Sequence, residues 1–328
     1  MNSVKEIGGY FSLDLGALGE CNNECFSSIR KEDKIRMNAA RYAIVYSVKE
    51  GGFSKVFLPI YMCESVKETL EKYNIGYSFY NINKELEPTI ESIDENECIM
   101  ICNYFGLKNK QFYEKYINKF KNIIFDNTQC FYQKPFIKDG IYNVYSPRKF
   151  FGVPDGAYLI KRNIKKINLD ISVSSDYSSF LLKSIEDGTN SGYKEYLDSE
   201  SRIAAEGMKG MSKLTLNILS SINYDYVKQC RSENFKVLSN LLRQSNSLFV
   251  NYDADLYPMV YSYLTDKEEL RTKLINNKVY IPQWWKWVLK TQEANDFEKR
   301  LSQFLLPLPI DHRYNSGDME YIAKLLLE

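Results

Sequence analysis

Apolar and polar residues follow two different periods along the first half of the chain. Between residues 34 and 48, apolar side chains recur about every 3.6 residues, which predicts a helix that Gly51 and Gly52 terminate. The same period predicts helices over residues 66–73 and 110–121, whereas short continuous apolar runs predict buried strands. The predicted strands are residues 56–59, 77–80, 98–102, 122–125 and 141–145.

Alternating strands and helices predict a mostly parallel sheet with helices on both faces, which is a three-layer α/β/α domain. Ligands of such domains lie beyond the carboxyl ends of the strands, and Asp126 and Tyr104 follow two predicted strands. A long helical pattern over residues 201–242 precedes short strands and two helices, over residues 267–276 and 318–327. We therefore predict a large domain of residues 1–220 and a smaller α+β domain of residues 221–328.

The composition limits the possible partners. The chain has 328 residues, 44% of them hydrophobic, and its 43 basic and 42 acidic residues leave a net charge of +1. Such a chain can bury a sizeable core but has no long-range field that attracts nucleic acid or a membrane surface. The first residues lack the order of a signal peptide, and no run reaches the roughly 18 apolar residues of a membrane helix. We expect a cytoplasmic protein whose partners are small molecules or other subunits.

Cysteine usage gives no sign of a metal site. The chain has seven cysteines and one histidine, and CxxC pairs are absent. A chain of this length does not need disulfides for stability, so the free thiols indicate a reducing compartment. We predict no metal site.

Two short segments carry the candidate chemistry. Asp126 follows the apolar strand residues 123–125, and Lys149 follows the turn that ends the strand Ile141–Tyr145. An amine and a carboxylate in one crevice are what pyridoxal phosphate requires: the amine forms a Schiff base with the aldehyde, and the carboxylate keeps the pyridine nitrogen protonated. Each residue also has an ordinary explanation, because most lysines are solvated surface groups and an aspartate after a strand often caps a turn.

Around these residues the chain resembles the DegT/DnrJ/EryC1/StrS family of sugar aminotransferases, which are fold-type-I pyridoxal phosphate enzymes. The family has a lysine followed by an acidic residue and two glycines, and here Lys149 is followed by Asp155, Gly156 and Ala157. Its aspartate stands three residues before a glutamine or histidine, as Asp126 stands before Gln129. The resemblance extends from residues 7–11 to residues 308–314, so it covers nearly the whole chain.

The resemblance implies roles for several residues. Lys149 and Asp126 are the implied catalytic residues, and Gln129 is implied to contact the ring hydroxyl of the cofactor. Asn38, Ala39 and Ala40 match the small-residue turn that opens a helix and binds the phosphate, which moves the expected helix start from Lys34 towards Met37. Ser146 resembles the phosphate-binding serine of many fold-type-I enzymes.

The remaining candidate site residues each have two possible interpretations. Tyr61 or Tyr104 covers the cofactor ring or packs in the core, and Arg41 and Arg148 either contact phosphate or pair with a carboxylate. Tyr10, Trp284 and Arg313 are the candidate substrate residues, although Trp284 also fits a domain core or an interface and Arg313 lies in a turn beside the single histidine.

The implied function is transfer of an amino group from an amino acid, such as glutamate, to a keto-sugar, as expected in surface polysaccharide or aminosugar biosynthesis. A lysine at position 149 argues against the dehydratase branch of the family, in which histidine replaces it. The resemblance implies a homodimer, in which Tyr193 or Lys194 serves the neighbouring active site or belongs to an ordinary surface loop. Another pyridoxal phosphate reaction on the same scaffold, or a non-catalytic relative, remains an alternative.

Overall fold

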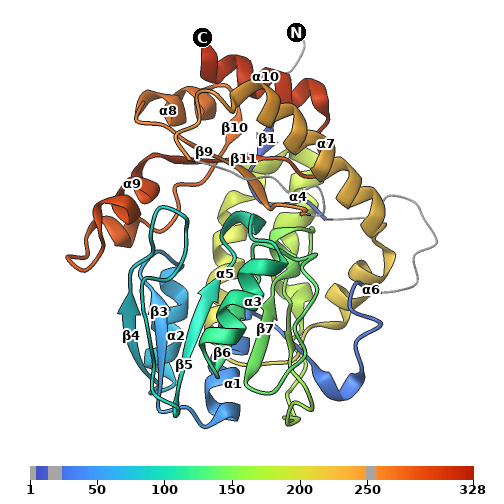
Figure 1. Ribbon diagram of the computed structural model, residues 1–328. Helices are drawn as coiled ribbons and strands as arrows, with labels where there is room; N and C mark the ends of the chain where they lie inside the picture. Colours follow the sequence, from blue (N-terminus) through green and yellow to red (C-terminus); the bar gives the residue numbers. More distant parts are fainter. Residues whose placement is uncertain (1–4, 14–23, 249–255) are drawn as a thin grey trace.

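A seven-stranded sheet forms the centre of the large domain (Figure 1). The computed structural model describes residues 5–13, 24–248 and 256–328. The strand order is β2-β8-β7-β6-β5-β3-β4, with parallel pairing from β7 through β6, β5 and β3 to β4 and antiparallel pairing of β8 with β7 and β2. The strands are β2 (Lys34–Met37), β3 (Lys55–Pro59), β4 (Gly76–Tyr80), β5 (Glu97–Cys102), β6 (Ile123–Asp126), β7 (Ile141–Tyr145) and β8 (Ala157–Ile160).

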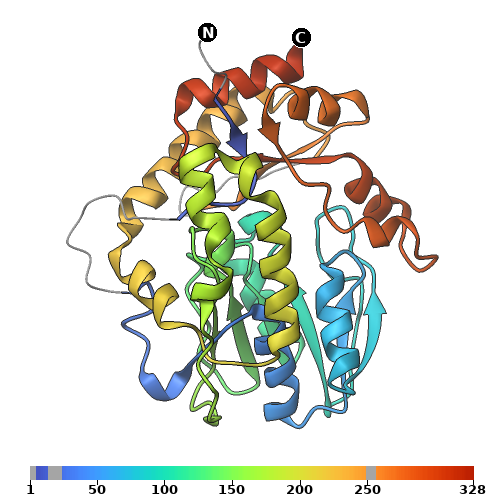
Figure 2. The same ribbon diagram turned by 180° about the vertical axis from the view of Figure 1, so that it is seen from behind.

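Helices cover both faces of this sheet, as the sequence predicts. Helix α3 (Lys110–Lys119) lies in front of the sheet in Figure 1. On the opposite face, seen in Figure 2, lie α1 (Ala40–Gly51), α2 (Glu64–Lys72), α4 (Ser179–Asp187) and α5 (Tyr193–Glu206). The predicted three-layer α/β/α arrangement around a mostly parallel sheet is therefore confirmed.

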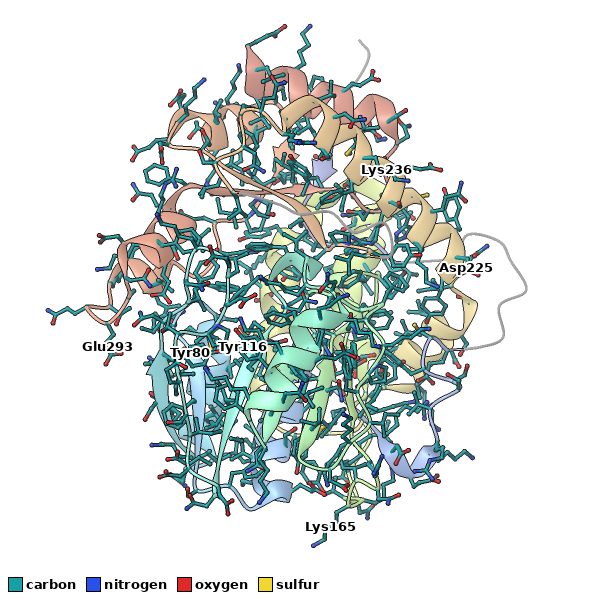
Figure 3. The ribbon with its side chains drawn as sticks, in the orientation of Figure 1. Tyr80, Tyr116, Lys165, Asp225, Lys236 and Glu293 are labelled. Carbon is teal, nitrogen blue, oxygen red and sulfur yellow. The ribbon has the colours of Figure 1, made fainter. Side chains whose placement is uncertain are left out.

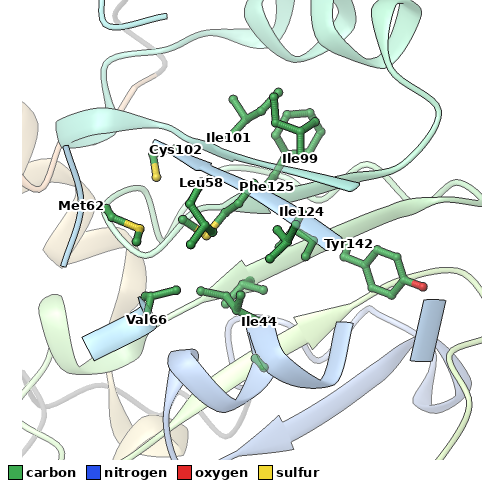
Figure 4. Packing of buried hydrophobic residues seen from close by; sticks show 14 of the residues in the cluster. Ile44, Leu58, Met62, Val66, Ile99, Ile101, Cys102, Ile124, Phe125 and Tyr142 are labelled. Carbon is green, nitrogen blue, oxygen red and sulfur yellow. The ribbon is translucent and has the colours of Figure 1, made fainter. Parts of the chain in front are cut away.

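Side chains of the central strands alternate between the two faces, because successive residues of a strand point in opposite directions. Ile124 lies on the same side of the sheet as Ile44 of α1, whereas Ile99 and Ile101 lie on the other side (Figure 4). All six residues of β5 are buried, which explains their continuous apolar pattern. Asp126 is two residues beyond Ile124, so it faces the α1 side at the end of β6.

The helix predicted over residues 34–48 begins later than its pattern suggests. Lys34–Met37 forms the edge strand β2, paired with β8, and α1 begins at Ala40, beyond even the start near Met37 that the family resemblance favours. The first part of that prediction is wrong, because the partner that makes these residues a strand lies about 120 residues later in the chain and leaves no local period. At its other end α1 terminates at Gly52, which has a φ of 65°, as predicted.

The continuous helical pattern predicted over residues 201–242 is divided into three helices. Helix α5 ends before Gly207, α6 covers Lys213–Ser221, and α7 covers Tyr224–Leu242. Gly210 lies between α5 and α6 and forms bridges with Met37 and Ile171, so this connection returns to the sheet. The predicted domain boundary near residue 220 falls at the end of α6.

The C-terminal region consists of short strands and helices around a second apolar cluster. Strand β9 (Val260–Leu264) pairs antiparallel with β11 (Leu305–Pro309), and the near-terminal β1 (Ile7–Gly8) pairs with β10 (Val279–Tyr280). Helices α8 (Glu269–Asn276) and α10 (Ser316–Leu327) pack together above these strands in Figure 1. Among the described residues, no helix is both long and apolar enough to span a membrane.

Several charged side chains lie at the surface of the molecule, and several aromatic side chains lie in its interior. Figure 3 shows Lys165, Asp225 and Glu293 at the periphery, whereas Tyr80 and Tyr116 lie inside the large domain and are almost fully buried. The hydroxyl of Tyr80 donates to the carbonyl of Met100, so this buried polar atom has a partner.

A buried carboxylate connects the C-terminal region to the large domain. Glu298 of α9 (Asp296–Phe304) is inaccessible to solvent and accepts hydrogen bonds from the amides of Asn295 and Ile82 and from the side chain of Asn81. Burial raises the pKa of Glu298, and these hydrogen bonds oppose that rise. One side chain thus caps α9 and fixes the loop that follows β4.

We predict that Glu298→Ala destabilises the protein by about 3 kcal/mol, because one buried and two partly buried donors lose their acceptor. The measurement is urea unfolding followed by circular dichroism. Glu91→Ala is the matched control, since Glu91 is exposed and its ion pair with Lys119 lies at the surface, and it should leave the unfolding midpoint unchanged. Equal midpoints for Glu298→Ala and the wild type would contradict this role of Glu298.

Candidate active site

A cavity of about 400 Å³ lies at the carboxyl ends of β5 and β6. Its wall combines the start of α1, the turn after β7, helices α4 and α5, and aromatic residues from the C-terminal region. Parallel strands end at the same edge of a sheet, which is why segments far apart in the sequence meet here. The predicted site residues that line this cavity are Tyr10, Ala39, Ala40, Tyr104, Asp126, Gln129, Ser146, Lys149 and Trp284.

Lys149 and Asp126 are connected through Thr128. The Nζ atom of Lys149 donates to Oγ1 of Thr128 at 2.8 Å, and the amide of Thr128 donates to Oδ1 of Asp126 at 2.9 Å. Lys149 ends the 3-10 turn Pro147–Lys149, directly after β7. Within the described part of the chain, no carboxylate oxygen lies within 4.0 Å of the Lys149 amine. Its hydrogen-bond acceptor there is the hydroxyl of Thr128.

The second carboxylate oxygen of Asp126, Oδ2, has a weak hydrogen-bond donor beside it. Cys102 pairs with Asp126 in the parallel register of β5 and β6, and its thiol lies 3.6 Å from Oδ2. Burial, reinforced by the nearby carboxylate, raises the pKa of the Cys102 thiol well above its usual range, so the thiol stays protonated and can donate. A thiol is a poor donor, and Oδ2 therefore retains capacity for a stronger one.

Gln129 supports the turn that follows β5. Its side-chain oxygen accepts a hydrogen bond of 2.6 Å from the amide of Phe105, whose φ of 61° lies in the left-handed region. A bulky residue in that region is strained, and strained residues cluster at ligand sites. The ring of Phe105 stacks on Trp284 with a centroid distance of 5.8 Å, so Gln129 also positions this aromatic wall.

Of the residues that the sequence assigns to the phosphate, Ala39, Ala40 and Ser146 line the cavity and Asn38 does not. Ala39 is the N-cap of α1 and has no side-chain capping bond, and Ser146 is a buried residue that follows β7. Asn38 does not line the cavity: its side chain donates to the carbonyl of Gly207 and accepts from the amide of Lys209. Asn38 therefore fixes the turn before α1 to the α5–α6 connection.

Asp155, the acidic residue of the lysine motif, has a structural role. It is fully buried and accepts hydrogen bonds from the amide of Ser212 at 2.9 Å and from its hydroxyl at 2.7 Å, and it also binds the hydroxyl of Thr215. Burial raises the pKa of Asp155, and these hydrogen bonds limit that rise. The turn after Lys149 is thereby joined to the start of α6.

Arg41 and Arg148 both pair with a carboxylate, which was one of the two interpretations of the sequence. Nη2 of Arg41 lies 3.2 Å from Oε2 of Glu200, and Nη2 of Arg148 binds the other oxygen of Glu200. Burial opposes the charges of Glu200 and Arg148, but their mutual attraction prevails: the pKa of Glu200 is lowered and that of Arg148 is raised. All three residues line the cavity, so this pairing is not on a solvated surface.

Tyr104 lines the cavity, whereas Tyr61 lies behind it. The hydroxyl of Tyr104 donates to the carbonyl of Tyr61 at 2.7 Å. Tyr61 is fully buried and packs edge-to-face against Trp285, with ring centroids 4.4 Å apart. Of the two predicted candidates, only Tyr104 is placed where it can contact a ligand.

Tyr10 and Arg313 also differ in their surroundings. Tyr10 lines the cavity and stacks on Tyr196 with an interplanar angle of 3°. Arg313 does not line the cavity and forms two hydrogen bonds to the buried Asp311, at 2.7 and 3.0 Å. Burial opposes ionisation of Asp311, yet Arg313 lowers the pKa of Asp311 to about 2. Arg313 also donates to the carbonyl of Tyr10, so it holds the segment that carries Tyr10.

Sequence reasoning missed several residues of this site. Thr128 is part of the strand-end motif, two residues after Asp126, and a role for its hydroxyl near Lys149 could have been anticipated. Cys102, Tyr196 and Glu200 offered no comparable signal, because each reaches the cavity through packing of distant elements. No group of three or more metal-ligating side chains occurs among the residues that the structure describes.

The architecture is that of fold-type-I pyridoxal phosphate aminotransferases, and the similarity extends over most of the chain. DesV from S. venezuelae, solved with a reaction intermediate, has a TM-score of 0.61 at 12% identity; the match covers 99% of this chain and 90% of DesV. An aminotransferase from Brucella abortus described as DegT DnrJ EryC1 StrS has a TM-score of 0.56 at 11% identity, with 89% of this chain and 84% of that chain covered.

A third similar structure has a different activity. The GDP-4-keto-6-deoxy-D-mannose-3-dehydratase of E. coli, solved with hydrated pyridoxal phosphate, has a TM-score of 0.57 at 11% identity, with 98% of this chain and all of that chain covered. No protein-family model and no curated protein matches the sequence. The predicted resemblance to the sugar aminotransferases is confirmed in three dimensions, and at this identity it concerns the fold.

Proposed function

We propose that this protein is a pyridoxal phosphate-dependent aminotransferase that moves an amino group from an amino acid, glutamate in the first instance, to a keto-sugar. The observation that carries this proposal is the common cavity of Lys149 and Asp126 at the strand ends of an aminotransferase fold. Similar structures include sugar aminotransferases, which supports a keto-sugar acceptor, nucleotide-linked, from a surface polysaccharide or aminosugar pathway.

The donor set fits the cofactor. When bound, pyridoxal phosphate supplies an aldehyde for the amine and a protonated ring that accepts electrons from the substrate. Among the described residues, Oδ2 of Asp126 has a weak thiol donor alone and can accept from the ring nitrogen, while Oδ1 is held by Thr128. The first amides of α1, at Ala40 and Arg41, face a cavity that Ser146 also lines, and such amides favour a phosphate.

Lys149 has two tasks in this proposal. Its Nζ atom would bond the cofactor aldehyde, whose oxygen would leave as water, and as a free amine Lys149 would carry the proton that the substrate carbon loses. Thr128 holds Nζ in the cavity by a hydrogen bond to its neutral hydroxyl, so the amine can move without breaking an ion pair. Asp126 keeps the ring nitrogen protonated throughout.

Aromatic residues form the side of the cavity that remains for the substrate. Trp284 stacks on Phe105, and Trp285 has a φ of 54°, a second bulky residue in the left-handed region. With Tyr10 and Tyr104, these residues offer flat apolar surfaces and a few polar groups, which suits a sugar ring.

A homodimer is part of the proposal. Leu182 and Ile185 of α4 are 54% and 47% exposed, and Tyr193 and Leu197 of α5 are 55% and 47% exposed. The same two helices supply cavity residues, including Phe180 and Tyr196. An apolar face of this kind marks an interaction site, and a second copy that covers it lies close to the active site, where Tyr193 or Lys194 can serve the neighbouring subunit.

We predict that the protein binds pyridoxal phosphate with a visible absorption band and that Lys149→Ala abolishes the band, because no amine remains to bond the aldehyde. Lys165→Ala is the matched control, since Lys165 lies at the periphery, and it should retain the band (Figure 3). Glutamate should bleach the wild-type band as the amino group moves to the cofactor. A colourless wild type would contradict the proposal, and a band that no amino donor bleaches would favour another reaction on this scaffold.

We predict that Asp126→Asn still binds the cofactor but slows the glutamate half-reaction by about a hundred-fold or more, because the ring nitrogen loses its anionic partner. Stopped-flow absorption measures this rate. The asparagine oxygen preserves the bond from Thr128, so the turn should remain intact. Asp139→Asn removes an exposed carboxylate and is the control. An unchanged rate for Asp126→Asn would mean that another group protonates the ring.

We predict that Leu182→Glu combined with Ile185→Glu converts a dimer into monomers, because two charges would be buried at the interface. Sedimentation velocity measures the mass of each species. Leu327→Glu, which changes an exposed apolar residue of α10 away from this face, is the matched control and should leave the dimer intact. A monomeric wild type, or a dimer that survives the double substitution, would refute the proposed interface.

A further inference from the structure

Arg41 and Arg148 approach the cavity from the two segments that the proposed function assigns to the cofactor phosphate. Arg41 is the second residue of α1, and Arg148 lies between Ser146 and Lys149 in the turn after β7. Both side chains are 15% exposed and line the cavity. Two cations therefore line the same cavity as the amides and the hydroxyl to which the proposed function assigns the phosphate.

Most donors of these two guanidinium groups are not used. An arginine has five N–H donors, and within the described residues each of these two arginines engages Glu200 through Nη2 alone. Nε of Arg148 is buried without any hydrogen-bond partner there. Leaving a buried donor without a partner is costly, so an acceptor that arrives with a ligand is favoured at this position.

Glu200 explains why two arginines can share this wall. Without a carboxylate between them, their like charges would repel in a partly buried site. Glu200 binds both and leaves the trio with a net charge of +1, because two cations accompany one anion. It is a positioning residue: it orients the guanidinium groups and leaves their other donors available.

We propose that Arg148, held by Glu200 alongside Arg41, binds the phosphate of the cofactor within the same subunit. This inference rests on the proposed function. Its chemistry is that of a guanidinium group donating to phosphate oxygens, which suits the planar arrangement of its N–H groups. The alternative anion, the carboxylate of the amino donor, is disfavoured because Ser146 and Arg148 belong to the same turn as Lys149, and Glu200 connects Arg148 to Arg41 at the start of α1.

The test compares the binding of pyridoxal phosphate with that of pyridoxal, which has the aldehyde and ring but no phosphate. Dissociation constants are measured by absorption titration for the wild type, Arg148→Met and Arg148→Lys. We expect Arg148→Met to weaken binding of pyridoxal phosphate by about ten- to hundred-fold while pyridoxal binding stays unchanged. Arg148→Lys keeps the charge and should recover part of the loss. Arg300→Met, which removes a partly exposed arginine paired with Asp266, is the control.

Three outcomes would overturn the inference. Equal weakening of both ligands by Arg148→Met would mean that the residue acts on the fold or on Lys149, and no effect on either ligand would mean that the arginine serves only Glu200. Weakened binding of glutamate with an unchanged affinity for pyridoxal phosphate would assign Arg148 to the donor carboxylate. A wild type that binds neither pyridoxal phosphate nor pyridoxal would instead reject the proposed function itself, so the two failures are distinguishable.

Discussion

Parallel pairing of β5, β6 and β7 is the constraint on which the site depends. The register places Cys102 next to Asp126 and Asp126 next to Val144, so three chain segments reach the same edge with fixed offsets. Alternation along β6 then turns Asp126 to the α1 side, together with Ile124. A register shift of one residue would turn Asp126 to the α3 side and away from the start of α1.

Buried polar side chains hold the loops at this edge of the sheet in place. Asp155 holds the turn after Lys149, Gln129 holds the turn after β5, and Asn38 holds the turn before α1. Each accepts from backbone amides of a distant segment, so the cavity wall is positioned by side chains rather than by a strand ladder. Such networks make the geometry sensitive to single substitutions, because every unmatched donor carries a large penalty.

Local patterns predict those parts of the fold whose partners are close in sequence. The strands β3, β5, β6 and β7 and the α2 and α3 helices follow from apolar runs and helical spacing, and Lys149 and Asp126 follow from strand-end chemistry. The edge strand Lys34–Met37 could not be predicted, because its hydrogen bonds go to β8. The role of Glu200 could not be predicted either. The helical pattern around Glu200 does not reveal that its side chain pairs with two arginines from other elements.

Arg313 illustrates the limit of residue-type reasoning. Arg313 lies in the last segment that resembles the family, and its residue type suggests that it binds a substrate carboxylate. In the structure it pairs instead with Asp311, a carboxylate of the same turn. Conversely, Arg148 was ambiguous in the sequence and has most of its donors available at the cavity wall. The difference lies in burial and in nearby acceptors, both of which depend on tertiary packing.

The most direct test of the account is to locate the lysine that bonds the cofactor. The protein is mixed with pyridoxal phosphate, treated with borohydride to make the bond permanent, digested, and analysed by mass spectrometry of its peptides. The account predicts one phosphopyridoxyl group, on Lys149, the lysine that lies in the cavity with Asp126. A phosphopyridoxyl group on another lysine, or none at all, would contradict it.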